Sequence, residues 1–172
     1  HNSSEKDKQL VDSLHTNPLF IVANHSETHA FRNKFHTFYR NPNSALQDFI
    51  TAESKLNIKY KIARLPGRNT WAINKKLKGE SSGFAVAKKL DSMGYSVFGW
   101  DAEWRFTHGH TPVQSATQMI KDVEHQLEHG KTYHQKSIVI LVHDRMFSTP
   151  QYADSLRKFI STMKNKDNYV FD

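Results

Sequence analysis

Apolar positions along the chain recur in two patterns, which together predict an alternation of helices and strands. In several segments apolar residues recur every three or four positions, which is typical of amphipathic helices. Helices are expected over residues 5–14, 28–39, from 44 onward, 83–93, 113–129 and 151–164. Pro112 is expected at the first turn of the fifth helix, where the missing N–H of proline costs no hydrogen bond.

Short apolar runs between these helices predict the strands. Residues 19–23 and 138–142 are apolar without alternation, the pattern of strands buried on both faces of a sheet. Further strands are expected over 60–65, 95–100 and, at the end, 169–171, and residues 66–81 are expected to form a long loop. Because helices separate the strands, we expect an α/β fold with a mainly parallel sheet.

Ionisable or metal-ligating side chains follow each of the four main strands. The segments are Asn-His-Ser-Glu-Thr-His (24–29), Arg-Leu-Pro (64–66), Asp-Ala-Glu-Trp (101–104) and His-Asp (143–144). In parallel sheets the functional site lies beyond the carboxyl ends of the strands. We therefore expect these side chains to gather at one edge of the sheet.

His25 and His29 are four positions apart and are the main metal candidates. On a helical turn this spacing lets both imidazoles reach one ion. The alternative is a pair that caps a surface helix, but the place directly after an apolar run favours a metal. Because the chain has no cysteine, the ion would be held by histidine and carboxylate, which suits zinc or another first-row metal.

His125 and His129 form a second pair with the same spacing. A zinc peptidase would need a glutamate directly after the first histidine, where this chain has Gln126. The pair also lies at the far end of a crossover helix. We interpret both residues as solvated cations near a helix C-terminus and expect no ion there.

The other strand ends carry candidates for acid–base work and substrate binding. His143 leaves an apolar strand and suits a general acid, although a satisfied core histidine is the alternative. Arg64 can hold a carboxylate in a bidentate pair or form an ordinary surface ion pair. Asp101 and Glu103 can orient a histidine, and Trp104 can support a sugar ring. Their alternative is a polar loop with an anchoring tryptophan.

Composition limits the class of partner. The 172 residues suit one domain, and no apolar run has the length of a membrane span. A net charge of +7 suits an anionic partner such as nucleic acid, an acidic membrane or an anionic polymer, or serves solubility alone. Nucleic acid is not expected, because no recognition motif is present. The polar residues 1–9 are no signal peptide, and the missing initiator Met indicates a mature or trimmed form.

The motifs His-Ser-Glu-Thr-His (25–29), Arg-Leu-Pro (64–66), Asp-Ala-Glu-Trp (101–104) and Leu-Val-His-Asp (141–144) together resemble motifs two to five of the NodB-type polysaccharide deacetylases, carbohydrate esterase family 4. The resemblance covers about residues 10–172. It implies a distorted (β/α) barrel forming a single catalytic domain over 1–172, outside the cell, in the periplasm or on the cell surface. It also implies metal-dependent hydrolysis of N-acetyl groups on an N-acetylglucosamine-containing polysaccharide, with zinc favoured among divalent ions.

The resemblance also assigns roles to single residues. His25 and His29 would hold the metal, and His143 would protonate the leaving amine. Asp101 or Glu103 would tune that histidine. The remaining assignments are Arg64 to positioning of the catalytic base, the Gly67 amide to the oxyanion, Leu141 to the acetyl pocket and Trp104 to the substrate.

The first motif of the family, Thr-Phe-Asp-Asp-Gly, is absent from this chain. That motif supplies the third metal ligand and the base, and only 24 residues precede His25. We therefore expect a fragment whose N-terminal strands are missing, with an Asp-Asp pair supplied by a further segment or a second chain. The alternative is a catalytically inactive deacetylase-fold module that binds a cell-surface glycan. The third motif also differs, because Gly67-Arg68 follows Pro66 where the family usually has Tyr-Gly.

Overall fold

A computed structural model describes residues 5–171, except for the side chain of Asp7. The chain divides into two compact units, one up to Gly99 and one from Trp100 onward, and each is described by itself. The fold is mixed α/β, as expected. Its two small sheets do not close into a barrel.

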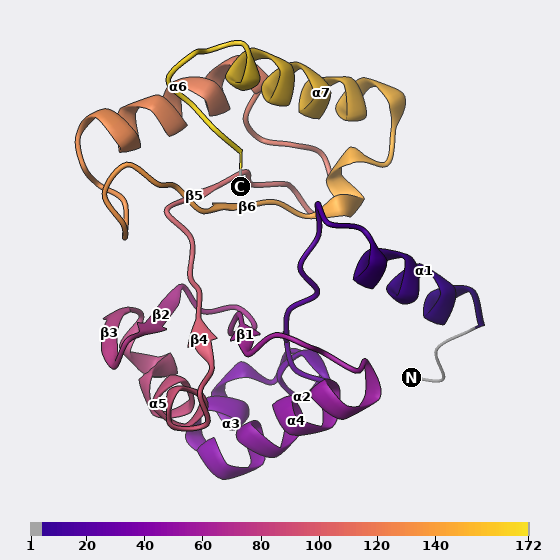
Figure 1. Cartoon of the computed structure of the whole chain (residues 1–172), viewed down its shortest axis with the longest axis vertical. Helices are drawn as coiled ribbons and strands as arrows, with labels where there is room; N and C mark the ends of the chain where they lie inside the picture. Colours follow the sequence, from indigo (N-terminus) through magenta and orange to yellow (C-terminus); the bar gives the residue numbers. More distant parts are fainter. Residues whose placement is uncertain (1–4, 172) are drawn as a thin grey trace. The chain divides into compact units, whose positions relative to one another are not determined.

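The first unit contains five helices and a four-stranded sheet among its described residues (Figure 1). The helices are α1 (Glu5–Thr16), α2 (His29–Asn33), α3 (Phe35–Arg40), α4 (Pro42–Lys55) and α5 (Phe84–Ser92), with a 3₁₀ turn at Ser81–Gly83. The strands are β1 (Ile62–Ala63), β2 (Thr70–Ile73), β3 (Lys76–Gly79) and β4 (Ser96–Val97), in the order β1-β4-β2-β3. Only β1 and β4 are parallel, so the expectation of a mainly parallel sheet was wrong for this unit.

A hairpin occupies most of the expected loop 66–81. Strands β2 and β3 pair antiparallel, with Trp71 opposite Lys78. The turn residues Asn74 and Lys75 both have positive φ, 51° and 64°, as a tight hairpin turn requires. The lysine-rich sequence of β3 lacks the apolar alternation that identifies a strand, which is why the pattern missed it.

Residues 19–23 do not form the buried strand that their sequence predicts. Leu19, Phe20 and Ile21 are 86%, 53% and 61% exposed. Only Asn24, directly after them, joins the sheet. Its N–H donates to the Ile62 carbonyl at 2.8 Å, and its carbonyl accepts from Arg64 N–H at 2.9 Å. The run 19–23 itself thus lies outside the sheet, because no described strand lies alongside it.

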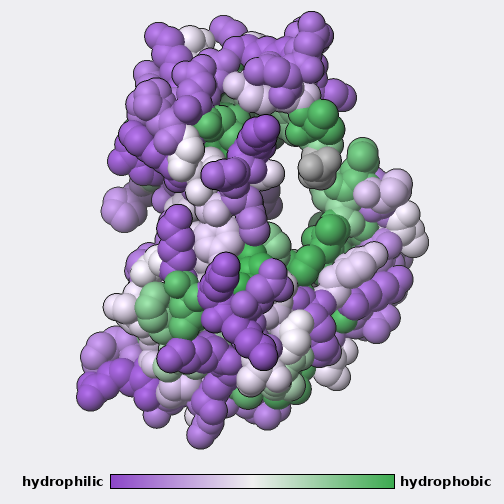
Figure 2. All heavy atoms as spheres, turned by 60° about the vertical axis from the view of Figure 1, so that its left-hand side comes forward, coloured by the Kyte–Doolittle hydropathy of each residue, from purple (hydrophilic) through white to green (hydrophobic). Residues whose placement is uncertain are grey.

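The core of the first unit lies between the sheet and the helices α3, α4 and α5. Its largest fully buried side chains are Phe38, Phe49, Leu65, Val86, Leu90, Tyr95 and Val97. The predicted apolar stripes of α4 and α5 supply several of these residues, so the helical periodicity was a correct guide here. On the outside of the molecule hydrophilic residues predominate in the view of Figure 2.

The second unit packs two helices against a pair of short parallel strands. The elements are β5 (Ala102–Glu103), α6 (Ala116–Glu128), β6 (Ile140–Leu141), a 3₁₀ turn at Asp144–Phe147 and α7 (Pro150–Lys164) (Figure 1). Helix α6 begins after Ser115, whose hydroxyl accepts from Gln118 N–H, so the predicted start at Pro112 was wrong. Residues 169–171 form no strand.

Candidate functional site

The bridge between Asn24 and Ala63 brings His25 next to Arg64. Asn24 pairs in parallel with β1, so the residues after both segments emerge at the same edge. The Nδ1 atom of His25 lies 2.9 Å from the Arg64 carbonyl oxygen. Because a carbonyl can only accept, Nδ1 carries the proton, and the lone pair of the neutral ring lies on Nε2.

His29 lies in a left-handed turn rather than a right-handed helix. Ala30, Phe31 and Arg32 have φ of 56°, 55° and 59°. The predicted helix over 28–39 is therefore divided into this turn and the helix α3. Left-handed backbone costs about 1–2 kcal/mol per residue, and it persists where surrounding contacts determine it.

Asp48 supplies contacts that fix this turn. The buried carboxylate accepts from the backbone N–H and the hydroxyl of Thr28, at 3.1 and 3.0 Å. The Thr28 hydroxyl in turn accepts from Phe31 N–H at 2.8 Å. Ala30 is fully buried, which anchors the middle of the turn. The position of His29 is thus set by the packing of α4, which no local pattern reveals.

The two histidines face each other closely. Their ring centroids are 5.1 Å apart, with the planes at 61°. The Nδ1 atom of His29 lies 2.5 Å from the amide oxygen of Asn33, so this ring also carries its proton on Nδ1. Oxygen acceptors on Nδ1 are the usual supports of histidines that bind a metal through Nε2.

The donor set fits a metal site in part. His25 and His29 are two exposed nitrogen ligands of the kind zinc prefers. Within residues 5–171, however, no group of three or more histidine, aspartate or glutamate side chains is placed to hold an ion. A complete site would need at least one further ligand.

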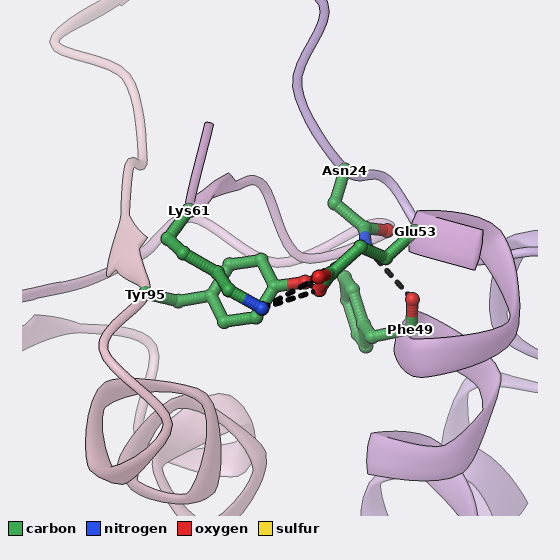
Figure 3. A network of polar contacts seen from close by, with 5 residues as sticks. All are labelled: Asn24, Phe49, Glu53, Lys61 and Tyr95. Carbon is green, nitrogen blue, oxygen red and sulfur yellow. Dashed lines mark hydrogen bonds and ion pairs between the residues drawn. The ribbon is translucent and has the colours of Figure 1, made fainter. Parts of the chain in front are cut away.

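A polar network beneath Asn24 fixes the residue that precedes His25 (Figure 3). The buried Asn24 amide donates to the Phe49 carbonyl at 2.8 Å and to the Tyr95 hydroxyl at 3.4 Å. The Tyr95 hydroxyl donates to Glu53, whose carboxylate also accepts from Lys61 at 2.6 and 2.7 Å. The Lys61 and Tyr95 hydrogen bonds lower the Glu53 pKa, and burial, with the bond to Glu53, raises the Tyr95 pKa to about 12.

The Arg64 side chain carries a largely buried guanidinium. Burial lowers its pKa. One Nη atom lies 3.5 Å from the Gly99 carbonyl, and Nε has no hydrogen-bond acceptor among the described residues. No described carboxylate forms an ion pair with it. The predicted bidentate partner is thus not among residues 5–171, and the role of Arg64 stays a prediction.

Gly67 forms an exposed, tightly constrained turn next to the histidines. Its φ is 59°, and a side chain there would come within 2.8 Å of the Phe35 ring. The Phe35 ring lies 6.0 Å from that of His29. Only glycine suits this conformation and this close approach. An N–H at Gly67 is compatible with the predicted oxyanion role.

In the second unit, the parallel pairing of β5 and β6 brings together the backbones of three predicted residues, Glu103, Trp104 and Leu141. Glu103 is in register with Leu141, and Trp104 N–H donates to the Leu141 carbonyl at 2.9 Å. His143 follows two residues later, half-buried, with its ring 4.9 Å from that of Phe106. The predicted gathering of these side chains at the carboxyl ends of the two strands stays a prediction.

Trp104 lies in the core of the second unit. Its side chain is 0% exposed, contacts the rings of Phe147 and Phe159, and donates from Nε1 to the Gln114 carbonyl at 2.9 Å. A ring buried on both faces offers no platform to a sugar. The structure therefore favours the alternative, an anchoring tryptophan, over substrate binding.

Asp101 organises the backbone before β6. Its two carboxylate oxygens accept from Tyr133 N–H at 2.6 Å and Val139 N–H at 2.9 Å. Glu103 is half-buried, and its backbone carbonyl accepts from Gln114. Asp101 thus holds the strand that leads to His143, whereas tuning of His143 by either carboxylate stays a prediction.

The second histidine pair lies at the end of α6, as expected. The rings of His125 and His129 are 4.1 Å apart, and Nδ1 of His129 lies 2.9 Å from the His125 carbonyl. The Lys131 ammonium donates a hydrogen bond to Nε2 of His125 at 2.9 Å. This nitrogen therefore faces a cation, an environment that disfavours a metal ion.

Sequence reasoning missed Asn24, Asp48 and Tyr95 as residues that support the histidine pair. A polar asparagine at the end of an apolar run was the one available signal, because a buried amide must find hydrogen-bond partners. The partners themselves come from distant segments.

A comparison with known protein families and with curated proteins found no match for the chain. None of the described helices is long and apolar enough to cross a membrane.

Proposed function

We propose that the chain is part of a metal-dependent polysaccharide deacetylase, which removes N-acetyl groups from an N-acetylglucosamine-containing polysaccharide. The observation that carries the proposal is the His25–His29 pair, with ring centroids 5.1 Å apart and both Nδ1 atoms on oxygen acceptors. Two histidines held in this way are suited to bind one divalent ion, for which we propose zinc.

Amide hydrolysis places three demands on the protein. A base must take a proton from water, a donor must stabilise the tetrahedral oxyanion, and an acid must protonate the leaving amine. We assign the second role to the Gly67 N–H and the third to His143. Leu141 would line the acetyl pocket. A bound divalent ion would supply Lewis-acid polarisation of the acetyl carbonyl.

We assign the base to none of the described residues. We propose that an Asp-Asp pair on a further segment or a second chain supplies it together with the third ligand, and that Arg64 positions that carboxylate. Among the described residues no carboxylate pairs with the buried Arg64 guanidinium, and this supports the proposal, because a buried cation gains most from a carboxylate partner. The complete domain would then have the distorted (β/α) barrel of the NodB type, at the cell surface, in the periplasm or outside the cell.

Zinc binding and acetate release test the proposal. Isothermal titration with zinc should give one site, lost in His25→Ala and in His29→Ala. His125→Ala is the matched control, since it removes a histidine with the same spacing and should leave the titration unchanged. Acetate release from N-acetylglucosamine oligomers should require the segment that bears the Asp pair. If zinc binds the first two variants as well as the parent, the proposed site is wrong.

A catalytically inactive module that binds a glycan is the second candidate. It is favoured by the lack of a three-ligand group within residues 5–171. On this alternative, N-acetylglucosamine oligomers bind without zinc and release no acetate even when the longer protein is assayed.

A further inference from the structure

Arg68 is held in a fixed position on the surface of the first unit. Its guanidinium lies over the rings of Tyr39 and Phe35, 5.0 and 5.7 Å from their centroids. Its Nη1 donates to the Gly67 carbonyl at 2.7 Å. The Tyr39 hydroxyl donates to the Pro66 carbonyl at 2.6 Å, which fixes the aromatic face below the guanidinium. Stacking of this kind orients the planar group before any ligand arrives.

One hydrogen-bond donor of Arg68 is unused among the described residues. Its Nε–H is buried and has no acceptor among them. The nearest carboxylate oxygen, on Glu80, lies 3.7 Å from Nε, which is an ion-pair distance too long for a hydrogen bond. The other Glu80 oxygen accepts from Asn69 N–H at 2.8 Å. Arg68 is thus a preorganised cation whose charge is only loosely balanced, and a better-placed anion would displace Glu80.

Phe35 connects Arg68 with the histidine pair. Its ring centroid lies 6.0 Å from that of His29 and 5.7 Å from the Arg68 guanidinium carbon. The proposed oxyanion donor, Gly67, precedes Arg68 directly. Arg68 therefore lies where it can contact a substituent of the same sugar unit, or of the next one, when an acetyl group is at His25 and His29.

We propose that Arg68 binds an anionic group, a carboxylate or a phosphate, on the N-acetylated glycan. The inference rests on the proposed function, which places the glycan at the histidine pair. A planar guanidinium matches both groups through paired N–H donors. The net charge of +7 would draw such a polymer to the protein. Gly67-Arg68 also stands where the family that the chain resembles usually has Tyr-Gly, so the substrate preference would be specific to this chain.

Binding of matched tetrasaccharides tests the proposal without added metal. The probes are neutral N-acetylglucosamine tetramer, the same tetramer with a 6-phosphate, and a tetramer in which N-acetylmuramic acid alternates and adds lactyl carboxylates. By isothermal titration, the protein should bind at least one charged probe more tightly than the neutral one. The charged probe that binds more tightly than the neutral probe identifies the preferred anion.

Substitutions at Arg68 and at Glu80 should change this preference in opposite directions. Arg68→Gln should weaken binding of the preferred charged probe by about tenfold or more and leave the neutral probe unchanged, as expected on loss of a charge-assisted pair. Arg68→Lys should retain part of the preference. Glu80→Gln should tighten charged binding, because it removes the competing carboxylate but keeps an acceptor for Asn69. Lys76→Gln, an exposed lysine on β3, is the matched control for net charge and should change nothing.

The result is decisive even if one variant fails to fold, since Glu80→Gln alone tests the competition. Equal affinity for all three probes, an equal loss for charged and neutral probes in Arg68→Gln, or unchanged charged binding in Glu80→Gln would overturn the proposal. Acetate release is measured separately on the longer protein. Anion preference without acetate release would retain the role of Arg68 and reject the deacetylase, whereas the reverse result would reject Arg68 alone.

Discussion

The imidazole of His25 is oriented by the backbone of Arg64, through a 2.9 Å hydrogen bond from Nδ1 to the carbonyl oxygen. The two residues are 39 positions apart and meet because Asn24 bridges to Ala63 in the parallel register. A backbone acceptor cannot be removed by substitution of the Arg64 side chain. The orientation of this candidate ligand is therefore a property of the strand pairing.

The tautomers of the histidine pair give the first prediction. The neutral rings of His25 and His29 should carry their proton on Nδ1, because each Nδ1 faces an oxygen acceptor. Long-range ¹⁵N–¹H correlation spectra distinguish the two tautomers. The exposed His36 serves as the control and should show the Nε2–H form that predominates in water. A Nε2–H signal for His25 would contradict the geometry.

The network of Glu53, Lys61 and Tyr95 gives the second prediction, a dependence of stability on pH. The folded-state pKa of Glu53 is lowered, so its contribution is complete above the pKa of the unfolded chain and is lost as pH falls through the folded-state value. The pKa of Tyr95 is raised to about 12, so its contribution is complete below the unfolded-state pKa of 10.0 and is lost as pH rises toward 12.

Two variants separate the loss of stability at low pH (the acid limb) from the loss at high pH (the alkaline limb). In urea unfolding across pH, Glu53→Gln should abolish the acid limb assigned to Glu53, and Tyr95→Phe should abolish the alkaline limb. Tyr95→Phe should also cost about 2 kcal/mol at neutral pH, since it removes a hydrogen bond to a charged group and one from Asn24. An alkaline limb that persists in Tyr95→Phe would show that another group is responsible.

The helices with strong apolar periodicity could be predicted from the sequence. For the strands, the sequence predicted the approximate positions but not the lengths or the pairing. The apolar stripes of α4, α5, α6 and α7 are local, and each folded close to its expected range. The strand positions near β1, β4 and β6 were also right, but the pairs are only two residues long. The run 19–23 has the pattern of a buried strand and is exposed, because burial requires a neighbouring strand that a local pattern cannot supply.

The candidate site could also be predicted only in part, because a local pattern does not show which segments pack together. Placing residues at strand ends brought His25 next to Arg64 and Glu103 next to Leu141, which the structure shows within each unit. It could not distinguish a side chain that points out from one that points into the core, and Trp104 proved to be a core residue. Nor could it find Asp48, whose contact with Thr28 depends on the packing of α4.

Trp104 gives the third prediction. Trp104→Ala should destabilise the protein by about 3–5 kcal/mol, because it leaves a cavity against Phe147 and Phe159. Trp104→Phe should cost less, retaining the packing but losing the Nε1 hydrogen bond to Gln114. Chemical denaturation measures both. A variant with unchanged stability and weakened binding of N-acetylglucosamine oligomers would restore the sugar-platform role.

The left-handed turn before α3 gives the last prediction. Arg32 is exposed with φ of 59°, a conformation that costs an L-residue about 1–2 kcal/mol and costs glycine almost nothing. Arg32→Gly should therefore raise the free energy of unfolding, by up to about 1 kcal/mol once the greater freedom of glycine in the unfolded chain is included. Arg40→Gly is the matched control, because Arg40 is also exposed but lies in the right-handed helix α3. There glycine should lower stability by about 1 kcal/mol. Opposite signs for the two substitutions would verify the handedness of the turn that carries His29, whereas losses of equal size would show that residues 29–33 form an ordinary right-handed helix.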